Sequence, residues 1–309
     1  MIIKKIFALL FVFTVLLFPQ KIKLGEQTKI NSEIINECYF PQFSKDDSKI
    51  IFSTESYKGL YTFDLKNQRT KIISEQNGAG YKPIFLNDEE VAIKTFKVEN
   101  GRKYHSVLIA NINTGISEVL EVDKRRISLP QQIVGADFIL LENSSINRKV
   151  LNNNKLQKTN QITKAIYSED NSLFIIKENE SIELSPLGKG VYVWESFSND
   201  GENIIFTFGN KGAFICDLEG NILTNIKDAH YPKFSPDGKF VLYMKDSDDG
   251  YKYIASDLFV YSLEEDTEYE LTNTEDKIEM YAEWSNDGKN IVYQTPQGEI
   301  YLAKIIIEN

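Results

Sequence analysis

Histidine and cysteine are the scarcest reactive residues of this chain. Its 309 residues include two histidines and two cysteines. Two histidines are too few for a histidine-rich metal site. The chain also lacks a Gly-x-Ser-x-Gly elbow and a glycine-rich phosphate loop, which excludes two common signatures of hydrolases and nucleotide-binding proteins.

The two cysteines, Cys38 and Cys216, are far apart in the sequence. Cys38 opens the first of the repeats described below, and Cys216 belongs to a much later one. In a ring of repeats these two would not be neighbours. We therefore expect both to be buried as small hydrophobic side chains rather than joined in a disulfide. Cys38 also lies too far beyond the N-terminal apolar run to be a lipid-attachment cysteine.

An extended apolar run occurs only near the N-terminus, over residues 6–18, after two lysines. Its length is that of a signal-peptide core and is short for a membrane span. We expect residues 1–20 to be a signal peptide and the protein to be exported, to a periplasm or out of the cell. Because residues 18–20, Phe-Pro-Gln, lack the small side chains of a cleavage site, the alternative is an uncleaved leader that anchors the protein in a membrane.

Basic residues are outnumbered, with 35 Lys and Arg against 45 Asp and Glu and a formal net charge of −10. Residues 1–20 contain two lysines and no acid, so the remainder is more negative still. No basic stripe offsets this charge, and nucleic acid or an anionic membrane surface would be repelled. We expect a protein partner, while the oligomeric state stays open.

What the chain does contain is a repeated motif: an aromatic residue, a serine, an Asp-Asp or Asp-Gly turn and an apolar run. Asp-Gly between two short apolar runs is a strong hairpin signal, because glycine adopts positive φ without steric cost. Each copy therefore predicts a strand, a tight turn and a second strand. Clear copies lie at residues 43–52, 197–206, 234–243 and 284–293, worn copies at 83–93 and 167–176, and a weak seventh at 134–141.

Third strands are predicted after the clear copies, at 60–65, 213–218, 257–263 and 299–303, and fourth strands at 70–73 and 267–272. Four-stranded units that recur every 40 to 50 residues or so are typical of β-propeller blades. We predict an all-β fold in which residues 21–309 form a single β-propeller domain of four-stranded blades, seven in number, with six as the alternative. The N-terminal segment Lys21–Ile30 has no blade of its own and is predicted to close the ring as a strand of the last blade.

The copies resemble the TolB-like family of WD-like propeller repeats, whose typical form is an aromatic residue, Ser-Pro-Asp-Gly, an apolar strand and an Ile-Tyr-like strand. Residues 231–263 match this form best, and residues 40–65, 194–218 and 281–303 match it well, whereas residues 100–165 match it poorly. The resemblance implies a rigid ring that acts by binding another protein in the cell envelope.

An aromatic column lies four residues before the motif serines, at Phe40, Trp194, Tyr231 and Tyr281. We predict that these four side chains line the mouth of the central channel as a binding surface. The alternative is that they pack between blades. In a regular strand, the residues two positions later would share their face, and the residues just before the serines would point into the blade core. The first set is Gln42, Ser196, Lys233 and Glu283, and the second is Phe43, Phe197, Phe234 and Trp284; the worn copies place Lys82 and Lys164 in the aromatic column.

Two classes of function fit these observations. We favour an exported, non-catalytic propeller that binds protein, or else a peptide or glycan, at its channel face, and we expect no catalytic residues, metal ligands or cofactor. The alternative is a channel-site enzyme, a metal-dependent lyase or hydrolase, for which Glu195, Glu283 and His230 are the candidates. The acidic segment 246–250 has oxygen ligands for calcium, but it lacks the distal glutamate of a calcium loop and is predicted to be a hairpin tip.

Overall fold

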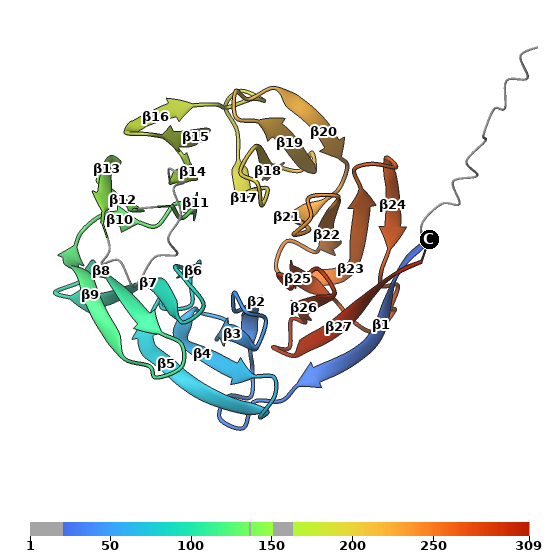
Figure 1. The fold of residues 1–309 in the computed structure, drawn as a ribbon, viewed down its shortest axis with the longest axis horizontal. Coiled ribbons are helices and arrows are strands. Elements are labelled where there is room, and N and C mark those ends of the chain that lie inside the picture. Colours follow the sequence, from blue (N-terminus) through green and yellow to red (C-terminus); the bar gives the residue numbers. More distant parts are fainter. Residues whose placement is uncertain (1–20, 136, 151–162, 309) are drawn as a thin grey trace, which may run out of the picture.

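The computed structural model describes residues 21–135, 137–150 and 163–308, and the regular elements in these ranges are all β-strands. Seven antiparallel sheets follow one another around a central axis as the blades of a β-propeller (Figure 1). The predicted all-β fold and the count of seven blades, rather than six, are confirmed. Residues 1–20, the predicted leader, lie outside the described residues. No helix in the described ranges is long and apolar enough to cross a membrane.

Four blades follow the simple order of four consecutive strands. Blade 1 consists of β2 (Tyr39–Phe43), β3 (Lys49–Ser53), β4 (Lys58–Asp64) and β5 (Arg69–Asn77). Blade 2 consists of β6 (Ile84–Phe85), β7 (Glu90–Glu99), β8 (Arg102–Asn111) and β9 (Ser117–Lys124). Blade 5 consists of β17 (Tyr192–Phe197), β18 (Asn203–Phe208), β19 (Ala213–Asp217) and β20 (Ile222–Ile226). Blade 6 consists of β21 (His230–Phe234), β22 (Phe240–Asp248), β23 (Tyr253–Ser262) and β24 (Thr267–Glu270).

One strand that lies between strands of blade 3 in the sequence belongs to blade 4. In the described residues blade 3 has three strands, β10 (Ile127–Ser128), β12 (Phe138–Glu142) and β13 (Ser145–Lys149). Strand β11 (Gln131–Ile133) instead pairs with β14 (Lys164–Glu169) of blade 4, which continues with β15 (Ser172–Lys177) and β16 (Glu180–Glu183).

The hairpin predicted over residues 134–141 is therefore wrong in part, because the strand before the turn joins the neighbouring blade. The Gln132 side chain bonds the backbone groups at the edge of β12 that have no strand partner there. The Gln132 side-chain amide accepts a hydrogen bond from the Ile139 N–H at 2.8 Å and donates one to the Ile139 carbonyl at 3.1 Å. A side chain thus replaces a strand partner at this position.

Blade 7 closes the ring as predicted. It consists of β25 (Met280–Trp284), β26 (Asn290–Gln294), β27 (Ile300–Glu308) and, as its fourth strand, β1 (Lys21–Ile30). Strand β1 pairs antiparallel with β27 from Lys21 opposite Glu308 to Ile30 opposite Ile300. Both ends of the described chain are thereby held in one sheet, with β1 and β27 side by side in Figure 1.

Apolar residues alternate between two neighbouring blades. In blade 1, Ile50 packs in a core shared with blade 7, while Ile51 packs in a core shared with blade 2. In blade 6, Val241 faces blade 5 and Leu242 faces blade 7. Because successive side chains of a strand point to opposite faces, a strand buried on both faces needs a continuous apolar run. Each such side chain contributes about 1.5 to 3 kcal/mol on burial, so the ring is held by apolar contacts between blades.

The motif serines close the turns of the four clear copies. Each serine Oγ donates to the aspartate two residues later and accepts the backbone N–H five residues later. For Ser285 these hydrogen bonds reach Asp287 Oδ1 at 2.7 Å and the Asn290 nitrogen at 2.9 Å. The same pattern occurs at Ser44, Ser198 and Ser235. The serine and aspartate of the motif are therefore turn residues.

The cysteines are buried in different cores. Cys38 is in the core between blades 7 and 1, and Cys216 is in the core between blades 4 and 5. Both thiols are free, and burial raises the pKa of each to about 12. The predicted role of both residues as small core side chains is confirmed.

Candidate binding site in the central channel

The aromatic column lies on irregular backbone. Phe40, Trp194, Tyr231 and Tyr281 have φ values of 57°, 56°, 52° and 55°, in the left-handed region that large side chains rarely adopt. The pairing register of each inner strand shifts across these residues, as in a β-bulge. The extra residue re-aims the aromatic side chain, so the regular alternation expected from the sequence does not hold here.

These four side chains line one cavity of about 400 Å³. Its remaining walls come from the segment between β5 and β6, from β11 and β14, and from other positions in blades 1, 5 and 6. A cavity lined by residues from both halves of the ring lies on the central channel. The predicted placement of the aromatic column around the channel agrees with this geometry, whereas its binding role stays a prediction.

The rings also contact one another across blades. Tyr231 and Tyr281 meet edge to face, with ring centroids 5.0 Å apart, and Trp194 lies 5.9 Å from Tyr231 and 6.5 Å from Tyr281. Phe40 lies 5.9 Å from Tyr281 and stacks on Tyr57 at 4.2 Å. Edge-to-face and stacked pairs are favourable arrangements of aromatic rings. The four column residues are half-buried, so they combine packing between blades with exposure to the channel cavity.

Two ion pairs lie among the aromatic rings. Glu283 accepts a hydrogen bond from the Tyr231 hydroxyl at 2.6 Å and pairs with Lys233 at 2.8 Å. The Lys233 ammonium also lies 4.5 Å from the centre of the Tyr231 ring. On the other side, Lys82 Nζ is 3.5 Å from Glu195 Oε1. Burial raises the pKa of Tyr231 well above its ordinary value, and the neighbouring Glu283 raises it further. The phenol therefore remains a neutral hydrogen-bond donor.

Lys82 and Lys164, which the worn copies place in the column, differ in position. Lys82 lines the channel cavity and has φ of 48°, as the aromatic residues do. Lys164 contacts blade 5 instead, where it pairs with Glu202 at 3.0 Å. The aromatic pattern missed Tyr57 and Tyr81, which line the same cavity. Tyr57 lies in the turn between β3 and β4, and Tyr81 lies between β5 and β6, next to Lys82. Neither is four residues before a motif serine, so the aromatic pattern did not include them.

The three candidates for an enzymatic site form separate interactions. Glu195 pairs with Lys82, and Glu283 pairs with Lys233. His230 Nδ1 lies 2.6 Å from Asp246 Oδ1, and this hydrogen bond raises the pKa of His230 above its ordinary value while burial opposes the shift. Within the described ranges, no group of three or more His, Cys, Asp or Glu residues is placed to hold a metal ion.

The acidic segment 246–250 spans the end of β22 and the start of its turn to β23, so only residues 249 and 250 belong to the predicted hairpin tip. The Asp249 carboxylate accepts the backbone N–H groups of Tyr251 and Lys252 at 2.9 and 3.0 Å. These bonds lower the pKa of Asp249. The aspartate acts as a turn former at this position.

Comparison with known proteins finds similar folds among solved structures. No family model matches the chain, and no curated protein matches it. Among solved structures, oligogalacturonate lyase from Vibrio parahaemolyticus is 12% identical with a TM-score of 0.49, over 87% of this chain and 78% of that one. TolB from Acinetobacter baumannii is 16% identical with a TM-score of 0.45, over 88% of this chain and 56% of that one. An oligogalacturonate lyase in complex with manganese is 13% identical with a TM-score of 0.49, over 87% and 78% of the two chains.

These likenesses are too weak to support an argument about function. The chain's own strands define its class, a seven-bladed β-propeller with an aromatic cavity in its channel.

Proposed function

We propose that this protein is an exported, non-catalytic binding propeller that holds a segment of a partner protein in its channel cavity. The observation that carries the proposal is the aromatic column in left-handed backbone. Four blades each hold a large aromatic residue at φ between 52° and 57°. Such backbone costs on the order of 1 to 3 kcal/mol per residue, and strain of this kind concentrates at functional sites.

The cavity suits a short peptide segment. Its volume of about 400 Å³ is at the small end of ligand sites, which hold a few side chains rather than a folded surface. Rigid aromatic walls are common anchors at protein interfaces because they offer large contact area at low entropic cost. Lys82 and Glu195, together with the Lys233–Glu283 pair, place both signs of charge beside the rings. Polar groups of a bound main chain could pair with them.

A location in the cell envelope or outside the cell is part of the proposal. It rests on the lysine-led apolar run of residues 6–18. Membrane anchoring through an uncleaved leader is the alternative. The resemblance of the motif copies to TolB-like repeats also supports a location in the cell envelope.

A pull-down from an envelope fraction tests the channel as a binding site. The protein without residues 1–20 is the bait, and Trp194→Ala and Tyr57→Ala are the channel variants. Tyr251→Ala, which removes a fully exposed tyrosine at the tip of the β22–β23 hairpin, is the matched control. We expect a protein captured by the native bait and by the control but lost with both channel variants. A contribution of about 2 kcal/mol per aromatic anchor corresponds to a loss of affinity of about 30-fold.

Thermal unfolding of each variant is the control for folding. Loss of binding counts only for variants that are folded. A partner retained by both folded channel variants would contradict the proposal. Capture of no protein by well-folded bait would also contradict it, and binding of an oligosaccharide or of stoichiometric metal would then favour the glycan-binding or enzymatic alternative.

A further inference from the structure

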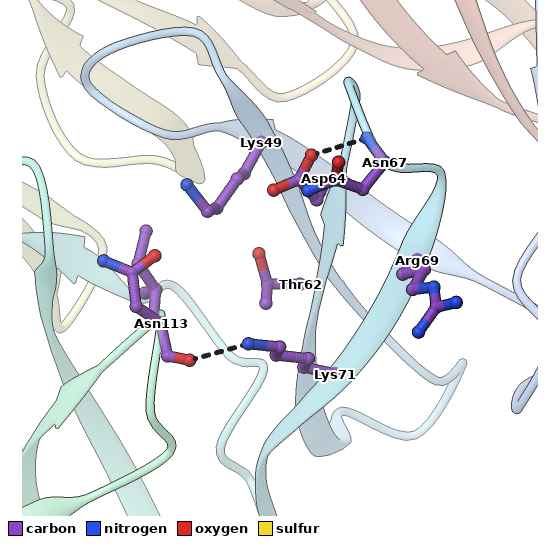
Figure 2. Close-up of a pocket in the computed structure, with 8 residues that line it drawn as sticks. Lys49, Thr62, Asp64, Asn67, Arg69, Lys71 and Asn113 are labelled. Atoms are coloured by element: carbon purple, nitrogen blue, oxygen red, sulfur yellow. Dashed lines mark hydrogen bonds between the residues drawn. The ribbon is translucent and has the colours of Figure 1, made fainter.

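A second cavity, of about 560 Å³, lies between blades 1 and 2, away from the channel residues (Figure 2). Its walls include Lys49 from β3, Thr62 and Asp64 from β4, Lys71 from β5 and Asn113 from the turn after β8. A volume of this size is within the range of small-molecule sites.

Strand register brings the polar residues of the cavity onto one face of blade 1. Lys49, Asp64 and Arg69 are directly aligned across β3, β4 and β5. In the next row on that face, Thr62 is aligned with Lys71. Three cations and one anion are thereby gathered at the edge of the apolar core shared with blade 2.

These cations are not neutralised by ion pairs. In the described part of the chain, no carboxylate lies within 4 Å of Lys49, Arg69 or Lys71 as an ion-pair partner. Lys49 Nζ donates to Ser48 Oγ at 3.0 Å, and Lys71 Nζ donates to the Asn113 carbonyl at 3.3 Å. Each ammonium group retains two more N–H groups. Asp64 and Asp46 attract Lys49 at longer range, and Glu33 attracts Arg69. Among the residues that line the cavity itself, three are cations and one is an anion.

Thr62 is the second, independent sign of a ligand. Its side chain is 2% exposed, and its hydroxyl has no hydrogen-bond partner. Figure 2 shows this hydroxyl between Lys49 and Lys71. The equivalent third-strand positions in blades 5, 6 and 7, which pair with the residue seven after the motif serine, are Ile215, Val260 and Leu302. Blade 1 therefore has a buried hydroxyl where those blades have an apolar side chain, although an unpartnered buried hydroxyl is destabilising.

We propose that the cavity between blades 1 and 2 binds a small molecule through a phosphate or sulfate group. The oxyanion accepts hydrogen bonds from Lys49, Lys71 and the Thr62 hydroxyl, and Arg69 adds positive charge at the rim. The Asp64 carboxylate accepts the backbone N–H groups of Asn67 and Lys66 at 2.9 and 3.0 Å. Those bonds, with Lys49 nearby, lower the pKa of Asp64. The carboxylate stays ionised and accepts a hydroxyl group of the same ligand.

Isothermal titration of the purified protein with inorganic phosphate and with sodium sulfate tests this site. Sodium chloride keeps the ionic strength constant, so that screening of charge is the same throughout the titration. We expect saturable binding of one oxyanion per chain. Lys71→Gln should weaken it about tenfold through loss of a charge-assisted hydrogen bond. Thr62→Val, which keeps the side-chain shape, should weaken it about fivefold and raise the melting temperature.

The matched control is Lys58→Gln, which removes an exposed lysine at the other end of β4 and should leave the affinity unchanged. Preference for phosphate over sulfate, or the reverse, shows which oxyanion the site selects. Binding that does not saturate, or that Thr62→Val and Lys71→Gln leave unchanged, would overturn the proposal. Neither result depends on the channel residues, so the oxyanion proposal and the channel-binding proposal are tested independently.

Discussion

Phe40, Trp194, Tyr231 and Tyr281 could be found from their spacing to the motif serines, but their conformation could not. Glycine, asparagine and aspartate are the residues that signal positive φ in a sequence, and a large aromatic residue there is an outlier. The bulges that follow from this backbone changed which residues share a face. Gln42 and Lys233 do line the cavity with the aromatic rings, whereas Ser196 and Glu283 are not among its lining residues.

The residues just before the motif serines behaved as the alternation predicted. Phe43 is buried between blades 7 and 1, and Phe197, Phe234 and Trp284 pack partly buried against cores. The regular alternation of the strand after the bulge is enough to predict that these side chains point into the blade core. Thr62 could not be predicted in this way. That its buried hydroxyl has no hydrogen-bond partner is visible only after the register of β3, β4 and β5 is known.

His230 should make the stability depend on pH. The bond to Asp246 raises the folded-state pKa of His230, with Asp228 and Asp248 adding to the effect. The resulting stabilisation is full below the ordinary pKa of about 6.5 and is lost as the pH rises through the higher folded-state value. We expect His230→Gln to lower the free energy of unfolding by about 1 kcal/mol more at about pH 5.5 than at about pH 8.5.

Urea unfolding at the two pH values measures this difference. His105 provides the control, because burial lowers its pKa. Its replacement by glutamine should not cost extra stability at the acidic pH. An equal loss for His230→Gln at both pH values would contradict the role assigned to the His230–Asp246 bond.

The hairpin between the first two strands of a blade is the element that the sequence determines best. Its Asp-Gly turn and its serine are local signals, and the four clear copies fold as predicted. Strand β11 was not predictable in this way, because it pairs with β14 of blade 4 while the Gln132 side chain bonds the edge of β12. No pattern in the sequence marks a side chain that replaces a strand.

Removal of a single motif hydroxyl should therefore weaken a hairpin measurably. Ser285→Ala leaves the half-buried Asn290 N–H without its side-chain acceptor and removes one of the hydrogen bonds that Asp287 accepts, while the bond from the Lys289 N–H remains. We expect a loss of about 1 to 3 kcal/mol in the free energy of unfolding, measured by urea denaturation. Ser117→Ala, at an exposed position of β9, should change it by less than about 0.5 kcal/mol. Equal effects of the two substitutions would mean that the hydroxyl does not support the turn.

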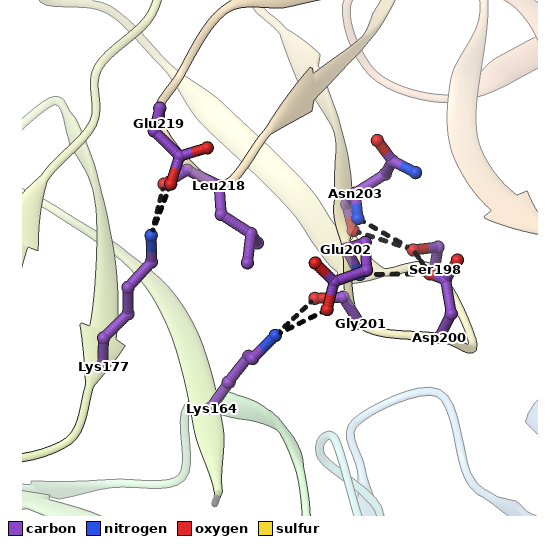
Figure 3. Close-up of polar contacts among 9 residues, drawn as sticks. All are labelled: Lys164, Lys177, Ser198, Asp200, Gly201, Glu202, Asn203, Leu218 and Glu219. Carbon is purple, nitrogen blue, oxygen red and sulfur yellow. Dashed lines mark hydrogen bonds and ion pairs between the residues drawn. The ribbon is translucent and has the colours of Figure 1, made fainter.

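Lysines of blade 4 reach blade 5 at two levels (Figure 3). Lys164 Nζ lies 3.0 Å from Glu202 and 3.1 Å from the Gly201 carbonyl. Lys177 Nζ lies 3.0 Å from both Glu219 and the Leu218 carbonyl. Both carboxylates are largely exposed, so each pair adds at most about 1 kcal/mol. These contacts orient neighbouring blades that the apolar core already holds together.

Blade 7 closes the ring with strands from both ends of the described chain, and this closure was predictable by counting strands. The last copy lacked a fourth strand, and Lys21–Ile30 had no blade of its own. The core between blades 7 and 1 joins Ile30 and Ile300 to Phe43 and Phe52 of blade 1. Hydrogen bonds from the Asn286 side chain to the Asp47 carboxylate at 2.6 Å and to the Ser44 carbonyl at 2.9 Å also cross this boundary.

Deletion of residues 21–35 should destabilise all seven blades together. The deletion exposes the edge of β27 and removes Ile22 and Ile30 from two separate cores. Two buried isoleucines alone correspond to about 4 to 10 kcal/mol, a large part of the stability of a typical protein. Thermal unfolding followed by circular dichroism should show one transition at a much lower temperature. An unchanged transition would mean that the ring does not need β1.

The pairing of β1 with β27 also determines how the ring responds to mechanical force. Lys21 and Glu308 face each other at one end of the pair, and Ile30 and Ile300 face each other at the other end. A pull applied between Lys21 and Glu308 would load the hydrogen bonds in succession, as in a zipper, rather than all at once. The blade that closes the ring is thus the one that would open first, and at low force, under tension on these two residues.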